Sequence, residues 1–180
     1  MAGYDLTFSP VKSVSTLWAI APPEIAQAIA GAHDAAVQDA LTFLERQVLY
    51  TREGKDGARQ VETKGLIAAA FTHRDSRDGD PDLHTHVSVA NKVQTVEGKW
   101  LSIYGRVLHQ HVVAASETYN TALESHLGAS LGIRFVEPRG DRGQAVDSGR
   151  RSIWHVFGTA TRLTGRRTGL TWKDAPERYW

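Results

Sequence analysis

The sequence predicts an α+β fold: an antiparallel β-sheet with helices packed on one face and a three-histidine metal site on the other. Short segments alternate apolar and polar residues with the period of two that half-buried strands require. Two longer segments repeat apolar residues every three or four positions, the pattern of amphipathic helices. Turn-forming residues separate neighbouring strand segments as in hairpins, so we expect mostly antiparallel pairing.

The composition excludes several classes of site. The chain of 180 residues has the length of one ordinary domain. Its 21 Lys and Arg nearly balance its 20 Asp and Glu, so the net charge neither supports nor excludes nucleic-acid binding. The lack of cysteine excludes disulfides, thiolate zinc sites and cysteine nucleophiles. No apolar run resembles a signal peptide or a transmembrane helix, so we expect a cytoplasmic protein without a membrane partner.

The first predicted strand covers residues 4–8. Its apolar side chains share one face, and the carboxylate of Asp5 lies on the opposite, polar face. Ser9 and Pro10 end this strand, and a short helix is expected over residues 12–19.

A long helix is predicted over residues 25–47, after a proline at its first turn. Its apolar stripe consists of Ile25, Ile29, Ala32, Ala36, Ala40 and Leu44. His33 lies beside this stripe, so we expect it at the surface or at the boundary of the core. This helix is scaffold for the sheet.

A hairpin with strands over residues 48–52 and 59–63 follows the long helix. Arg52, Lys55 and Arg59 lie close together in it and offer contacts to phosphate groups. A solvated, charged turn is the alternative interpretation of these residues.

Three histidines occupy the next hairpin. His84 and His86 project to the same side of one strand, about 7 Å apart along it. A preceding strand over residues 66–74 folds back across a turn-forming loop at 75–82 and brings His73 beside this pair. Three neutral imidazoles on one ion leave coordination positions open, which is typical of a catalytic metal site. An accidental surface cluster is the alternative.

Residues 91–96 and 99–103 are expected to form another hairpin around Glu97 and Gly98, and a second long helix is predicted over residues 107–131. His109 and His111 cannot bind one ion on a helix, because side chains two positions apart point about 200° from one another. We divide the chain into a domain over residues 1–138 and a basic tail over 139–180, expected to be poorly ordered. Single-stranded nucleic-acid binding by its Arg and Trp residues is the alternative.

Five segments together resemble a known family. They are Asp5-Leu-Thr-Phe-Ser-Pro-Val-Lys-Ser-Val-Ser15, Thr51-Arg52, Phe71-Thr-His-Arg74, Asp80-Pro-Asp-Leu-His-Thr-His86 and Asn91. In this order they resemble the relaxase domain of MobF/TrwC-type conjugative relaxases, members of the His-hydrophobe-His endonuclease superfamily. The resemblance covers roughly residues 4–135, with Thr85 in the place of the hydrophobe.

The resemblance implies a function. In such relaxases a histidine-bound divalent ion, Mg²⁺ or Mn²⁺ and alternatively Zn²⁺, grips the scissile phosphate of single-stranded DNA at a plasmid transfer origin, and a tyrosine attacks it. Other relaxosome proteins are possible partners. His73, His84 and His86 match the ligands, and Asp5 matches an acidic residue that orients or deprotonates the tyrosine. The family's nucleophilic tyrosines precede the strand that begins here at Tyr4, and a helicase follows the relaxase, so we expect this chain to be the middle of a relaxase with impaired cleavage.

Candidate contacts to DNA phosphates are Lys12, Arg52, Lys55, Arg74 and Arg77. Tyr4 is not expected to be the nucleophile, because its neighbour Asp5 takes the face of the metal site. Two other functions stay open. One is a metal-dependent phosphodiesterase that uses metal-activated water, and the other is a DNA-binding remnant without catalysis.

Overall fold

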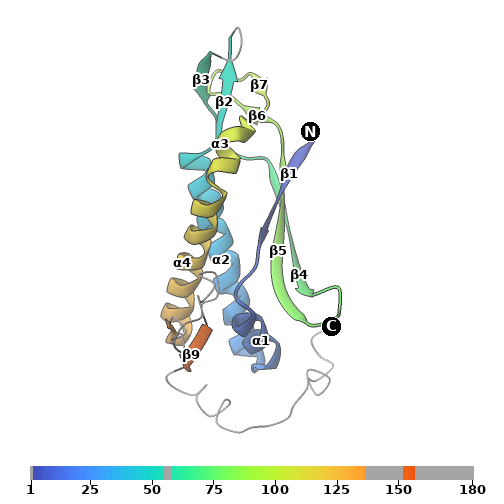
Figure 1. Ribbon diagram of the computed structural model, residues 1–180, viewed down its shortest axis with the longest axis vertical. Coiled ribbons are helices and arrows are strands. Elements are labelled where there is room, and N and C mark those ends of the chain that lie inside the picture. The colour runs from blue at the N-terminus through green and yellow to red at the C-terminus, as the bar shows by residue number, and fades with distance from the viewer. Residues whose placement is uncertain (1, 55–57, 137–151, 157–180) are drawn as a thin grey trace, which may run out of the picture. The chain divides into compact units, whose positions relative to one another are not determined.

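The computed structural model describes residues 2–54, 58–136 and 152–156 (Figure 1). The chain forms two compact units. Unit 1 comprises the described parts of Met1–Phe8, Ala36–His73 and His84–Ala122, and unit 2 those of Ser9–Ala35, Arg74–Leu83 and Leu123–Trp180. Several long elements, among them α2 and α4, contribute residues to both units.

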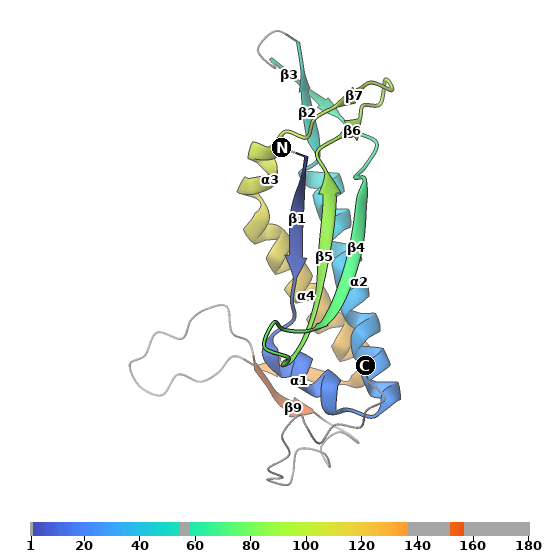
Figure 2. The same ribbon diagram turned by 90° about the vertical axis from the view of Figure 1, so that its right-hand side faces the viewer.

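A three-stranded sheet carries the histidines. It has the order β1-β5-β4, formed by β1 (Gly3–Phe8), β5 (Pro81–Ala90) and β4 (Ala68–Asp75) (Figure 2). β1 and β5 pair antiparallel, with Leu6 opposite Val87. β4 and β5 are joined by only five residues, which is too short for the crossover that parallel strands need. The predicted hairpin over residues 66–86 is confirmed.

The two faces of this sheet differ in burial. Along β5 the buried residues are Leu83, Thr85, Val87 and Val89, and they alternate with the less buried His84, His86 and Ser88. On β1, Phe8 is buried while Asp5 and Thr7 are exposed. The alternation with period two therefore produces one core-facing surface and one open surface, as the sequence predicts.

Helices cover the apolar face in unit 1. A core cluster contains Leu44 of α2 (Pro23–Gln47), Val48 just after it, Leu108 of α3 (Gly105–Gln110) and Ala115 of α4 (Val112–Leu131). Tyr4 and Leu6 of β1 pack against this cluster. The rings of Phe8 and Tyr119 lie 5.4 Å apart. Burial of apolar area against these helices is what holds β1 in place.

The single helix predicted over residues 107–131 is wrong in one respect, because the chain forms two helices that meet at His111. The backbone of His111 has φ −105° and ψ 7°, outside the α-helical region. Its Nδ1 donates a hydrogen bond to the carbonyl of Val107 at 2.9 Å, and its backbone N–H bonds to Leu108 at 3.2 Å. The tighter turn interrupts the helix.

Two small hairpins complete unit 1. β2 (Tyr50–Glu53) pairs with β3 (Arg59–Glu62), and β6 (Val93–Gln94) pairs with β7 (Trp100–Leu101), both antiparallel. The second hairpin is shorter than predicted, because the turn takes up residues 95–99: Thr95 and Lys99 are joined by a backbone hydrogen bond of 2.8 Å.

Unit 2 contains α1 (Lys12–Ile20), the first half of α2, the second half of α4 and a pair of strands, β8 (Ile133–Val136) and β9 (Ser152–Val156). The strand β9 lies inside the tail for which the sequence predicts no element. The rest of residues 139–180 lies outside the described residues. In the part of the chain that the structure describes, no helix is long and apolar enough to cross a membrane.

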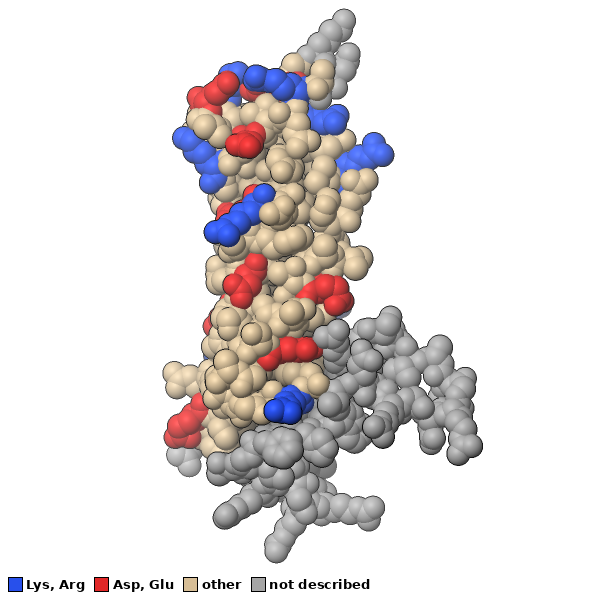
Figure 3. Space-filling view, turned by 90° about the vertical axis from the view of Figure 1, so that its left-hand side faces the viewer, with Lys and Arg blue, Asp and Glu red and all other residues tan. Residues whose placement is uncertain are grey.

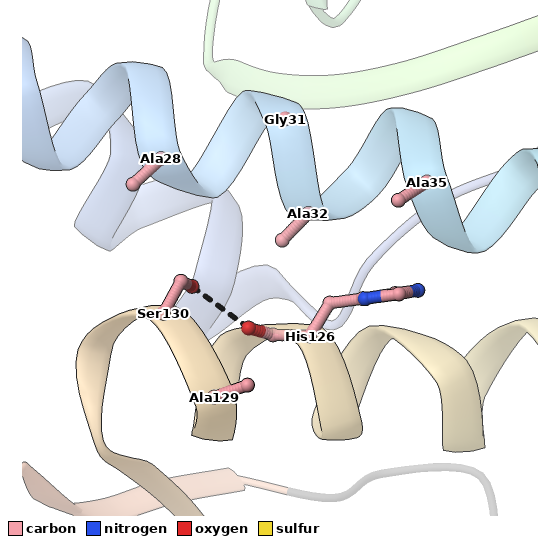
Figure 4. A pocket seen from close by; sticks show the side chains of 7 residues that line it. All are labelled: Ala28, Gly31, Ala32, Ala35, His126, Ala129 and Ser130. Atoms are coloured by element: carbon pink, nitrogen blue, oxygen red, sulfur yellow. Dashed lines mark hydrogen bonds between the residues drawn. The ribbon is translucent and has the colours of Figure 1, made fainter.

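Small side chains line a shallow hollow between α2 and α4 in unit 2 (Figure 4). Ala28, Ala32 and Ala35 of α2 lie across from Ala129 and Ser130 of α4. In the same part of α2, His33 is fully buried, so the expectation of a surface position is wrong. His33 and Val37, four positions apart on the helix, are both buried beside the predicted stripe. The buried face of α2 is therefore wider than the predicted stripe and includes one polar side chain.

Candidate metal centre

His73 of β4 and His84 and His86 of β5 form one cluster in unit 1. Each pair of these rings has its centroids 5.2 Å apart. Each histidine offers one ring nitrogen, and these three atoms lie within 4.8 Å of one another. His73 is exposed, whereas His84 and His86 are half-buried. The sequence prediction that these residues come together is confirmed.

The donor set fits a divalent ion. Nitrogens bound to one ion at about 2.1 Å would lie about 3 Å apart. Small rotations of the three rings would therefore bring their nitrogens within bonding distance of one ion. Imidazole is a ligand for several transition metals, and three such ligands do not select one ion. The geometry therefore supports metal binding without naming the metal.

His86 is oriented by β1. Its Nδ1 lies 3.0 Å from Oδ2 of Asp5 and 3.1 Å from the hydroxyl of Thr7. Because a carboxylate only accepts hydrogen bonds, Nδ1 carries the hydrogen, and Nε2 is left with the lone pair that binds a metal. Antiparallel pairing explains the contact, since Thr7 is the register partner of His86 and Asp5 that of Ser88.

The family resemblance implies that Asp5 acts at the nucleophile. The hydrogen bond to His86 gives Asp5 a second role, which the sequence did not predict. A carboxylate bonded to a metal-binding histidine fixes the orientation of the ring and raises the basicity of its free nitrogen. Thr7 was missed altogether. The available signal is the alternation of β1, which places Asp5 and Thr7 on the same face, two positions apart.

The rings of three described tyrosines have contacts outside the cluster of His73, His84 and His86. Tyr4 packs edge-on against His109, at 6.0 Å, and its hydroxyl lies against Gly105. Tyr119 is buried, and this burial raises its pKa well above the usual range. Tyr104 lies under the guanidinium of Arg52. Tyr119 is therefore a poor nucleophile, and Tyr4 faces away from Asp5, as alternation predicts.

The candidate phosphate contacts have different surroundings. In unit 1, the guanidinium of Arg52 stacks on Tyr104 at 4.3 Å, which leaves its outer face available. In unit 2, Lys12 donates a hydrogen bond of 2.7 Å to the carbonyl of Pro81, while Arg74 and Arg77 are exposed. Lys55 lies outside the described residues.

Lysine and arginine side chains gather together with acidic ones over the hairpins of unit 1 (Figure 3). Glu53 accepts hydrogen bonds from Arg59 at 2.6 Å and from Lys99 at 3.1 Å. Hydrogen bonding to Arg59 lowers the pKa of Glu53, and the same bond raises that of Arg59. Arg59 and Lys99 are therefore partly neutralised, whereas Arg74 and Arg77 form no ion pair with another residue that the structure describes.

Comparison with known proteins identifies the family. Residues 1–165 match the family model described as TrwC relaxase. The multifunctional conjugation protein TraI of Escherichia coli is 42% identical over 172 residues, which are 92% of this chain and 9% of that protein. TraI of E. coli strain K12 is 40% identical over 102 residues, 56% of this chain and 6% of its own length.

Solved structures agree. The metal-free conjugative relaxase TrwC in complex with oriT DNA matches with a TM-score of 0.71 and 29% identity over 84% of this chain and 50% of its own. The metal-bound TrwC complex with oriT DNA matches with a TM-score of 0.70 and 29% identity over 84% of this chain and 49% of its own. The chain thus spans about half of these solved chains and less than a tenth of the curated relatives. The chain belongs to the TrwC relaxase family, and the sequence it spans is relaxase-domain sequence of the MobF/TrwC type.

Proposed function

We propose that this chain binds one divalent ion through His73, His84 and His86 and binds single-stranded DNA of a transfer origin for site- and strand-specific nicking by transesterification. The observation that carries the proposal is the three-histidine cluster on the open face of the sheet, with His86 oriented by Asp5. The similar TrwC structures contain oriT DNA, and one of them is metal-bound, which supports extending both ligands to this family member.

When bound, the ion supplies Lewis acidity at a phosphate oxygen of the scissile group. The chain's own residues prepare for this. Strand β5 presents His84 and His86 on one side, and β4 adds His73. Asp5 accepts the hydrogen of His86 Nδ1 and so holds the tautomer in which Nε2 is a ligand atom. The open face leaves room for an extended DNA strand.

In transesterification a tyrosine oxygen bonds to phosphorus while the bond from phosphorus to the leaving deoxyribose oxygen breaks, and the phenol proton passes to a base. The buried Tyr119 and the helix-facing Tyr4 are not suited to this attack. Tyr50 and Tyr104 lie on or against β2 and not on the strands that carry the histidines. We therefore assign ion and DNA binding to the described residues, and the attacking hydroxyl to a tyrosine outside them. Asp5 remains the proposed carboxylate that orients or deprotonates that tyrosine.

The test is a denaturing gel with end-labelled single-stranded origin DNA and Mn²⁺, run beside anisotropy binding measurements. A covalent adduct that requires His84 supports transesterification. Free 5′ and 3′ ends without an adduct support hydrolysis by activated water, for which the half-exposed histidines leave access. Binding without cleavage supports the role as a metal- and DNA-binding part of a relaxase. A wild-type chain that binds neither Mn²⁺ nor DNA would overturn the proposal.

A further inference from the structure

Thr85 stands between the two histidines of the motif, on the opposite face of β5. It is 2% exposed, and its hydroxyl lies 3.0 Å from the hydroxyl of Thr72. Thr72 directly precedes His73 on β4. A hydroxyl pair thus joins the buried Thr85 to the exposed Thr72 on the face of the sheet opposite the three histidines.

Side-chain burial does little to define the register of β4. All eight residues of β4 are exposed, so burial of an apolar face does not select its register, as it does in a half-buried strand. Ala68, Ala69 and Ala70 are identical in side chain and cannot distinguish one register from another. Backbone bonds of 2.9 Å hold the two ends of the hairpin, from Ser76 N–H to the carbonyl of Asp80 in the loop and from Ala90 N–H to the carbonyl of Ile67 just before β4. Between these ends, next to His73, the threonine pair is the side-chain hydrogen bond that the described residues provide.

A slip of β4 by two residues would keep its faces but move His73 by about 7 Å, away from the other ligands. Such a slip would place Ala70 or Arg74 opposite Thr85. Alanine offers no hydroxyl, and arginine offers a long cation beside a buried position. Among these registers, only the observed one pairs two short hydroxyls and brings the three histidines together.

We propose that the hydroxyl pair Thr72–Thr85 holds the register of β4 against β5 and thereby positions His73 for metal binding. This inference rests on the proposed metal site. Thr85, in the middle of the His-x-His motif, would then be a positioning residue. A hydrophobic residue at this position would be held by burial alone, whereas Thr85 also forms a directional hydrogen bond to β4.

The experiment compares the wild-type chain with Thr72→Val, Thr85→Val and the double variant. Valine has nearly the shape of threonine, so each change removes a hydroxyl with little change in volume. Each single variant should weaken Mn²⁺ binding in calorimetry by about 5-fold, the factor expected for the loss of one ordinary hydrogen bond. The double variant should lose no more than Thr85→Val alone, because Thr72→Val breaks only the bond that Thr85→Val already removes. Thr85→Ser keeps the hydroxyl and should restore most of the affinity.

Thr118→Val is the matched control. Its hydroxyl donates a bond of 2.8 Å to the carbonyl of Ala114 within α4, and its loss should leave Mn²⁺ affinity unchanged. Unchanged affinity in all the Thr72 and Thr85 variants, or losses that add in the double variant, would overturn the proposal, because the loop or other contacts would then set the register.

Amide hydrogen exchange in the metal-free protein provides a second readout. The amides of β4 should exchange faster by several fold in Thr72→Val and Thr85→Val, with β1 unchanged. Amide exchange tests the threonine pair independently of the metal site. If the wild-type chain binds no Mn²⁺, the proposed metal site fails, and exchange still decides whether the threonine pair holds β4. Equal exchange in wild type and variants would reject the pair on its own.

Discussion

β5 and β4 both carry histidines of the proposed metal site, but the two strands are held in place in different ways. β5 lies between its two neighbours and alternates buried with less buried residues, so the core determines which side chains face the site. β4 is an edge strand whose eight residues are all exposed. Burial can therefore fix His84 and His86 of the proposed site, whereas the position of His73 depends on how β4 pairs with β5.

The largest effect should follow from a change on the buried side of β5. Leu83→Ala removes a side chain that is 1% exposed and should lower the free energy of unfolding by about 2–5 kcal/mol, through lost transfer energy and a cavity. Phe71→Ala on β4 removes a larger side chain that is 53% exposed and should cost less than about 1 kcal/mol. Denaturant unfolding measures both. Equal losses would contradict the contrast between the strands.

A smaller effect is expected at the carboxylate that orients His86. Asp5→Ala removes the acceptor of its Nδ1 hydrogen and should weaken Mn²⁺ binding by about 10-fold. Asp5→Asn keeps an acceptor oxygen and should lose less. Thr7→Val tests the second contact of the same nitrogen, and calorimetry with Mn²⁺ compares all three. Wild-type affinity in Asp5→Ala would show that the ring is held without Asp5.

The smallest effect concerns DNA. Arg74→Gln should weaken binding of single-stranded DNA and lower the slope of log affinity against log salt by about 1, as the loss of one phosphate contact does. Arg59→Gln is the matched control, because Arg59 is already paired with Glu53, and its slope should change less. Fluorescence anisotropy over a salt series gives both slopes. A larger change for Arg59 would place the DNA contacts on the hairpins and not on β4.

The sequence predicts the parts of this fold that burial determines. Alternation gives β1 and β5 and the face of Asp5, and the spacing of His84 and His86 together with a turn-forming loop brings in His73. These patterns suffice because the period of a strand converts directly into a face.

Features that depend on specific tertiary partners were not predictable. The break at His111 depends on its ring bonding to Val107, and the burial of His33 depends on how closely the helices pack around a polar side chain. The pairing of Thr7 with His86 and of Thr72 with Thr85 requires the strand register, which no single segment encodes. Lys55 and most of the tail after residue 138 remain predictions.

The proposed metal site is tested by calorimetric titration with Mn²⁺. The titration compares the wild-type chain with His73→Ala, His84→Ala and His109→Ala. His109 is exposed on α3 and outside the cluster, so it controls for the loss of an imidazole. We expect one ion per wild-type chain, unchanged affinity in His109→Ala, and affinity at least about 10-fold weaker in both His73→Ala and His84→Ala. Equal affinity in all four proteins would contradict a metal centre built from these two strands.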